Sequence, residues 1–171
     1  PRTYKNKPVT SIASGAFYGC RNITSVTIPD SVTSIEYRAF QDCTSMTSVN
    51  IPGSVTHIDL LVFDNCNERL YTKLGEIKYV DNWAIGVTSE TIKSANIKSG
   101  TRGIAQGTFS DCNGITSVSL PDSLEIIGPY AFKNCQMLTR VTIPNSVTEI
   151  GFSAFENCDL KRVVIPDGVT S

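Results

Sequence analysis

Residues 23–45, ITSVTIPDSVTSIEYRAFQDCTS, form one unit of a pattern that recurs along the chain. The same order of apolar residues, proline, Ala-Phe and cysteine returns from residue 115 and from residue 138, and also from residue 46 with Val62 in place of the alanine. The six cysteines are separated by 23, 23, 46, 23 and 23 residues, and six of the seven phenylalanines lie three residues before a cysteine. Because independent positions keep one period, the sequence is a repeat array.

The spacing of apolar residues divides the unit into the sides of a coil. Val26 and Ile28 alternate with polar residues, which predicts a short strand with one buried face. The proline that follows ends the strand because it has no N–H to donate. Val32 and Ile35 then point inward on the next side, and we expect a short helical or 3₁₀ turn around Ala39-Phe40 on the far side.

A coil of this length cannot bury its own apolar face, so neighbouring coils must stack. Stacked strands lie about 4.8 Å apart, so equivalent Ile, Val, Phe and Cys side chains form ladders through the interior. We expect a single repeat domain over residues 1–171. Residues 169–171 begin another unit, which predicts either a longer parent array or end-to-end self-association of chains.

Residues 70–91 interrupt the repeat, yet Cys66 and Cys112 are 46 residues apart, which is twice the period. One unit has therefore been replaced by a segment of nearly equal length. Within it, residues 77–80 and 83–85 flank Asp81-Asn82, a pattern typical of a β-hairpin with a two-residue turn.

This hairpin has two interpretations. If it projects from the array, Tyr79 and Trp83 would contact a partner, because inserts in repeat proteins often lie on a binding face. If it covers the core where a coil is missing, both rings would be buried, as large aromatic side chains usually are. Tyr79 and Trp83 are kept as candidate ligand-binding residues, with burial as the alternative.

The unit L-x-x-V-x-I-P-x-S-V-T-x-I-x-x-x-A-F-x-x-C resembles the BspA-like class of leucine-rich repeats. Residues 115–124 and 138–147 match it closely, and the resemblance covers about residues 9–69 and 92–171. It implies a β-rich α/β fold, a right-handed leucine-rich-repeat solenoid with short parallel strands on its concave face and short helical or 3₁₀ turns opposite. It also implies a bacterial or protist surface or secreted protein that adheres to host matrix or to other cells.

Composition and motifs argue against several other classes of protein. With 15 basic and 16 acidic residues, the net charge of −1 gives no electrostatic reason to expect nucleic acid as a partner. No apolar run reaches the roughly 20 residues that span a bilayer, so membrane insertion is not expected. The sequence has no phosphate-binding glycine loop and no G-x-S-x-G motif, and its only histidine, His57, occupies a variable repeat position. We expect neither enzyme activity nor a cofactor.

The six cysteines share one position of the unit, so their side chains point in parallel. Their Cβ atoms should lie about 5 Å apart, beyond the roughly 3.5–4.5 Å of a disulfide. We expect free, buried thiols that fill the interior as small apolar groups. A zinc site is not expected, because the sequence has no C-x-x-C pair and only one histidine.

The polar positions between the buried strand residues form the exposed side of the ladder. One interpretation is a shallow protein-binding face on which Arg140 and Arg162 bind an acidic group. The other is a solvated strand face on which Ser and Thr merely suit a sheet. The candidate ligand-binding residues on this face are Ser25, Thr27, Ser48, Asn50, Asn96, Ser117, Ser119, Arg140, Thr142 and Arg162.

These observations and the resemblance together predict a protein-binding or adhesion module that recognises host matrix or another cell-surface protein through its concave face. The alternative is a structural spacer within a larger surface protein, with no ligand of its own. In both cases we expect an extracellular or cell-surface location, with a leader outside this stretch of sequence.

Overall fold

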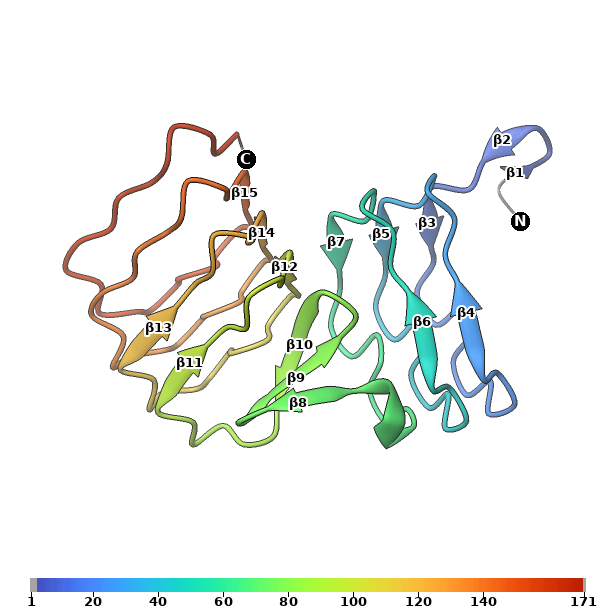
Figure 1. The fold of residues 1–171 in the computed structure, drawn as a ribbon, viewed down its shortest axis with the longest axis horizontal. Helices are drawn as coiled ribbons and strands as arrows, with labels where there is room; N and C mark the ends of the chain where they lie inside the picture. Colours follow the sequence, from blue (N-terminus) through green and yellow to red (C-terminus); the bar gives the residue numbers. More distant parts are fainter. Residues whose placement is uncertain (1–2, 171) are drawn as a thin grey trace. The chain divides into compact units, whose positions relative to one another are not determined.

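The computed structural model describes residues 3–170 and forms a β-solenoid of short strands with almost no helix (Figure 1). Its coils fall into two compact units, Pro1–Thr72 and Lys73–Ser171, and the boundary between the units lies inside the predicted insert. In both units, strands 23 residues apart pair in parallel. The period of the sequence is therefore one turn of the solenoid, which confirms the predicted stacking of coils.

The first unit contains two ladders of parallel strands. One ladder pairs β4 (Ser25–Thr27) with β6 (Ser48–Asn50) and confirms the strand predicted just before the repeat proline. The other joins β3 (Ser11–Ile12), β5 (Ser34–Ile35) and β7 (His57–Ile58). The side on which the sequence indicated only inward-pointing residues is therefore also a strand.

A short hairpin precedes the first coil. Strand β1 (Thr3–Tyr4) pairs antiparallel with β2 (Lys7–Pro8). Lys5 and Asn6 between them have φ angles of 49° and 62°. Positive φ at both central residues is what the commonest two-residue hairpin turn requires.

The second unit repeats the two-ladder arrangement. Its shorter ladder pairs β11 (Ser94–Asn96) with β13 (Ser117–Ser119) in register. Its longer ladder runs in parallel through β10 (Trp83–Val87), β12 (Gly103–Ile104), β14 (Ile126–Ile127) and β15 (Glu149–Ile150).

The insert forms the predicted hairpin and also supplies the first strand of that longer ladder. Strand β9 (Ile77–Val80) pairs antiparallel with β10 around Asp81-Asn82, and Asp81 has a φ of 54°. The other edge of β10 pairs in parallel with β12, so the hairpin takes the place of the missing coil. The sequence did not predict β8 (Thr72–Leu74), which lies beside β9, or the 3₁₀ helix η1 (Glu68–Leu70).

Tyr71 closes the last coil of the first unit. In the ordinary coils a cysteine thiol donates to a phenylalanine carbonyl one coil earlier, as Cys66 Sγ does to Phe40 O at 3.2 Å. The insert begins after Cys66, so no cysteine thiol of a following coil is available to donate to the Phe63 carbonyl. The Tyr71 hydroxyl donates to the Phe63 carbonyl instead, and it accepts from the Cys66 N–H at 3.1 Å.

The side of the coil around Ala39-Phe40 is a run of tight turns, so the predicted helical or 3₁₀ turn is wrong there. Between residues 3 and 170, η1 is the only helix. The amide of Ala39 donates to Glu36 within its own coil at 3.0 Å, whereas the amide of Phe40 donates to Val62 in the next coil at 3.0 Å. A helix needs its amides to bond within the same segment, so this alternation prevents one.

Left-handed residues also interrupt any helix on this side, because they cannot continue a right-handed turn. Each ordinary coil has two such positions. The first is occupied by Gly15, Arg38, Leu61, Gly107, Tyr130 and Ser153. The second is occupied by Gly19, Asp42, Asn65, Asp111, Asn134 and Asn157, which are residue types that tolerate positive φ.

The interior is filled by stacked aromatic rings and thiols, as the ladder prediction requires. Ring centroids are 5.2 Å apart in Phe17–Phe40, 5.8 Å in Phe40–Phe63, 5.0 Å in Phe109–Phe132 and 5.3 Å in Phe132–Phe155, all nearly parallel. The cysteines are free thiols, of which Cys43, Cys66, Cys112 and Cys135 are buried and Cys20 and Cys158 are half-buried.

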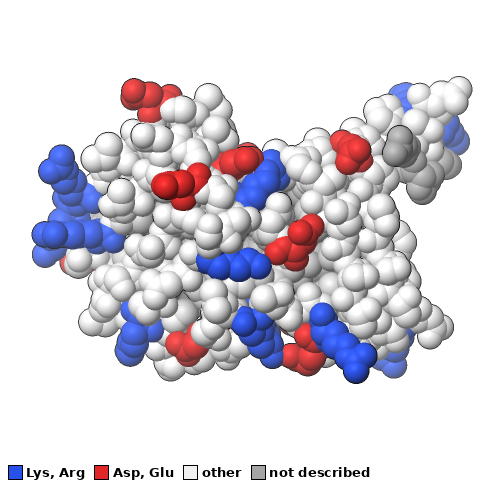
Figure 2. Space-filling view, in the orientation of Figure 1, with Lys and Arg blue, Asp and Glu red and all other residues white. Residues whose placement is uncertain are grey.

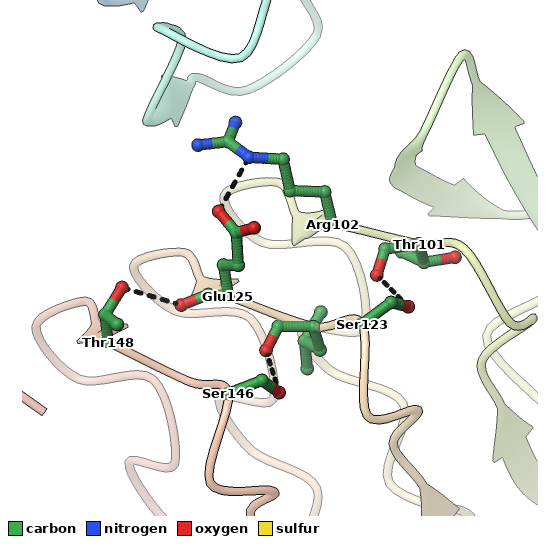
Figure 3. A network of polar contacts seen from close by, with 7 residues as sticks. Thr101, Arg102, Ser123, Glu125, Ser146 and Thr148 are labelled. Atoms are coloured by element: carbon green, nitrogen blue, oxygen red, sulfur yellow. Dashed lines mark hydrogen bonds and ion pairs between the residues drawn. The ribbon is translucent and has the colours of Figure 1, made fainter. Parts of the chain in front are cut away.

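The serine and threonine that follow the repeat proline link one coil to the next. The Ser123 hydroxyl donates to the Thr101 carbonyl at 2.9 Å, and Thr148 donates to the Glu125 carbonyl at 3.4 Å (Figure 3). In the first unit, Ser31 donates in the same way to the Val9 carbonyl at 2.8 Å. The sequence identified this serine only as a turn residue, whereas its hydroxyl satisfies a backbone carbonyl of the previous coil.

Thr101→Val should stabilise the protein by about 1 kcal/mol. The Thr101 side chain is fully buried, and its hydroxyl has no hydrogen-bond partner among residues 3–170. Most coils carry Val at this position, as at Val32 and Val147, so the valine methyls fit the site. Differential scanning calorimetry should show a higher Tm.

Thr108→Val is the matched control for this prediction. Thr108 is equally enclosed, but its hydroxyl donates to the carbonyls of Ala84 at 3.1 Å and Ala105 at 2.9 Å. The same substitution should therefore lower stability by about 1 kcal/mol. Equal changes in both variants would show that the unsatisfied hydroxyl at Thr101 is not the cause.

Candidate functional site

The ladder of β4 and β6 in the first unit and the ladder of β11 and β13 in the second each present a polar, exposed face. All ten candidate residues on this face are exposed, whereas Val26, Val49, Ala95 and Val118 between them are buried or half-buried. The pairing is residue by residue, with Ser25 opposite Ser48, Thr27 opposite Asn50 and Asn96 opposite Ser119. The predicted exposure is therefore confirmed, and its use for binding stays a prediction.

The C-terminal part of this face carries charge. Arg140 and Arg162 lie opposite each other in a parallel bridge, as the repeat alignment predicted. Figure 2 shows a cluster of basic side chains where Figure 1 draws the last coils. The two arginines lie on a groove of about 560 Å³, which is lined by Arg140, Val141, Thr142, Ile143, Asn145, Lys161, Arg162 and Val164.

Tyr79 and Trp83 are not on an exposed surface, which corrects their inclusion among the candidate ligand-binding residues. Their exposed fractions are 0% and 1%. The Trp83 ring lies against Gly103, where an added Cβ would be 2.5 Å from the ring. The hairpin is therefore a cover for the core, which is the alternative that the sequence left open.

Tyr79 also explains why Lys98 stands where other coils have proline. The Lys98 N–H donates to the Tyr79 hydroxyl at 3.2 Å, and the Lys98 ammonium lies 4.6 Å from the ring centroid. A proline has no N–H and would leave this buried hydroxyl without its donor. The hairpin therefore requires a residue with a backbone N–H at position 98 in place of the repeat proline.

The buried thiols of Cys66 and Cys112 are poor candidates for nucleophiles. Burial raises the pKa of the Cys66 thiol to about 12 and the pKa of the Cys112 thiol to about 11. Both therefore stay protonated at neutral pH, and a thiol is far less nucleophilic than its thiolate. Among residues 3–170, no group of three or more His, Cys, Asp or Glu side chains is arranged to hold a metal ion.

Sequence reasoning missed two features of the surface. Lys161 joins the two arginines on the groove, but it lies one residue before the strand positions whose alternation predicted exposure. In the first unit, Tyr18 and Tyr37 border a second groove of about 320 Å³ on the turn side. They occupy variable repeat positions, so only their size and exposure, 55% and 38%, distinguish them.

The family model described as the BspA type leucine rich repeat region matches six copies over residues 4–113 and 76–171. These ranges include nearly the whole chain, and their period is the coil described above. The chain belongs to the BspA-type leucine-rich repeat family. No curated protein gives a significant match.

Several solved structures are similar. A leucine rich cell surface protein from Faecalibacterium prausnitzii is 26% identical with a TM-score of 0.51, and the match covers 95% of this chain and 52% of that protein. The leucine-rich repeat protein of T. pallidum is 25% identical with a TM-score of 0.44, covering 98% and 68%. One from Bacteroides ovatus is 28% identical with a TM-score of 0.42, covering 99% and 51%.

This chain therefore spans about half of the F. prausnitzii protein and about two thirds of the T. pallidum protein. Helices of membrane-spanning length and apolarity are not found between residues 3 and 170.

Proposed function

We propose that this chain is a protein-binding or adhesion module of a cell-surface or secreted protein, and that the strand-ladder face is its binding surface. In this proposal residues 1–171 form one right-handed repeat domain, and the ladders line its concave side. The observation that carries the proposal is the run of exposed Ser, Thr, Asn and Arg side chains in fixed register on neighbouring strands.

Three further points support a binding role at a surface. Apart from the two arginines, the ladder face consists of short polar side chains on strands, which lose little conformational entropy when a partner covers them. Repeat solenoids offer such extended faces to protein partners. A similar structure with a TM-score above 0.5 is that of a cell surface protein, which favours the same location for this chain.

Binding to a panel of purified extracellular-matrix proteins, measured by surface plasmon resonance, tests the proposal. Ser117→Trp places a large ring on the exposed strand face, where a bulky β-forming residue is tolerated by the fold. It should weaken binding by about tenfold or more, because the ring blocks close approach. Gln136→Trp places the same ring on an exposed turn and should leave binding unchanged.

Two results would contradict the proposal. Equal loss of binding in both tryptophan variants would place the partner elsewhere on the molecule. If no protein in the panel binds, the spacer alternative is favoured, in which the coils only separate other parts of a larger protein.

A further inference from the structure

The arginine pair departs from the rest of the strand ladder. At the same position of other coils, Ser25 faces Ser48 and Ser94 faces Ser117. Here Arg140 faces Arg162 in a parallel bridge. Neighbouring strands are about 4.8 Å apart, and like charges at directly opposed positions destabilise a sheet. The two arginines therefore replace a neutral pair at some cost to stability.

A third cation lines the same groove, and nothing within the described chain neutralises the three. The Lys161 backbone N–H donates to the Thr139 carbonyl at 3.1 Å, which places Lys161 beside the arginine pair. Arg140, Lys161 and Arg162 form no ion pair with any residue from 3 to 170. By contrast, Lys133 pairs with Glu156 at 3.1 Å in the same unit.

The groove also has apolar walls. Val164 is 64% exposed, and Val141 and Ile143, which line the same groove, are 7% and 5% exposed. An arginine guanidinium can hold a carboxylate with two parallel hydrogen bonds, and an exposed valine gains by contact with an aliphatic side chain. The groove therefore combines sites for negative charge with a site for an aliphatic group.

We propose that this groove binds an acidic peptide segment in which Asp or Glu side chains alternate with aliphatic residues. The carboxylates pair with Arg140 and Arg162, Lys161 adds long-range attraction, and an aliphatic side chain covers Val164. A sulfated glycan would satisfy the cations but would leave the valine in water. This proposal rests on the proposed function and specifies the chemistry of the partner.

Fluorescence anisotropy with a labelled hexapeptide of alternating Glu and Leu tests the proposal directly. The peptide should bind the wild-type chain, and a Gln-Leu peptide of the same length should bind at least about tenfold more weakly. Arg140→Ser/Arg162→Ser should reduce binding of the Glu-Leu peptide by about tenfold or more. Arg21→Ser/Arg69→Ser removes the same charge from exposed positions of the first unit and should leave binding unchanged.

The melting temperature separates a binding role from a structural one. Because the serine pair is the ordinary occupant of this register, Arg140→Ser/Arg162→Ser should melt at the same temperature as the wild type or higher. A lower melting temperature would show that the arginines stabilise the fold, and the proposal would be wrong.

Two other outcomes would overturn it: unchanged peptide affinity in the double variant, or tighter binding of a sulfated heparin fragment than of the Glu-Leu peptide. Neither outcome bears on whether Ser117→Trp blocks a matrix protein, so the failure of this proposal is distinguishable from failure of the proposed function.

Discussion

Phe132→Ala should lower the free energy of unfolding by about 3–5 kcal/mol. The Phe132 side chain is fully buried, and its ring stacks on Phe109 and Phe155 at centroid distances of 5.0 and 5.3 Å. Backbone hydrogen bonds hold the two neighbouring coils, and with them the rings of Phe109 and Phe155, in place. The cavity left by the Phe132 ring therefore cannot close easily. Urea unfolding followed by Trp83 fluorescence reports on the same unit.

Phe152→Ala is the control for that loss. Phe152 is the phenylalanine outside the repeat pattern, is 62% exposed, and touches Tyr130 edge-on at a centroid distance of 4.7 Å. Its removal should cost less than about 1 kcal/mol. Similar losses in the two variants would contradict an interior aromatic stack, since the two positions differ chiefly in burial.

Gly103→Ala should destabilise the protein by about 1–3 kcal/mol or more. A Cβ at Gly103 would lie 2.5–2.6 Å from three carbon atoms of the Trp83 ring. The ring is rigid and buried, so either β10 or β12 must shift, and these strands form the parallel pair that joins the insert to the next coil. Urea unfolding measured by far-ultraviolet circular dichroism gives the loss.

A second glycine and a double variant make this prediction specific. Gly86→Ala adds the same methyl group in β10, where no atom beyond its two chain neighbours lies within 4 Å of the new Cβ, and should be close to neutral. In a Trp83→Leu background the clash is absent, so Gly103→Ala should there cost little. An equal cost of Gly103→Ala with and without the tryptophan ring would contradict the packing of Trp83 on Gly103.

The spacing of apolar residues was sufficient to predict the coil and the strand before the repeat proline, because stacking leaves one way to bury these residues. It was not sufficient for the turn side. Arg38, Leu61 and Tyr130 adopt left-handed conformations that nothing in their residue types indicates. The amides of Arg38 and Tyr130 donate to the carbonyls of Leu60 and Phe152 in the next coil, so their conformation depends on a contact 22 residues away. The Gly, Asn and Asp residues at the second left-handed position were a local signal for turns.

The candidate binding face was also predictable in part. Alternation along the strand predicted which side chains are exposed, and the period predicted that Arg140 and Arg162 would be neighbours. Lys161 was missed because it lies one residue before the strand positions whose alternation predicted exposure. Tyr79 and Trp83 were misassigned because the sequence of a hairpin does not show which of its faces packs on the core. Gly103 leaves space for the Trp83 ring, and this space determines that the ring packs on the core.

Nuclear Overhauser contacts between phenylalanine ring protons test the stacking of coils, on which the exposed ladder face depends. The ring of Phe132 should show cross-peaks to the rings of Phe109 and Phe155, which lie one coil away on each side. Phe109 and Phe155 should show none to each other. A direct contact between Phe109 and Phe155, or no contact from Phe132 to either, would contradict a solenoid with a 23-residue coil.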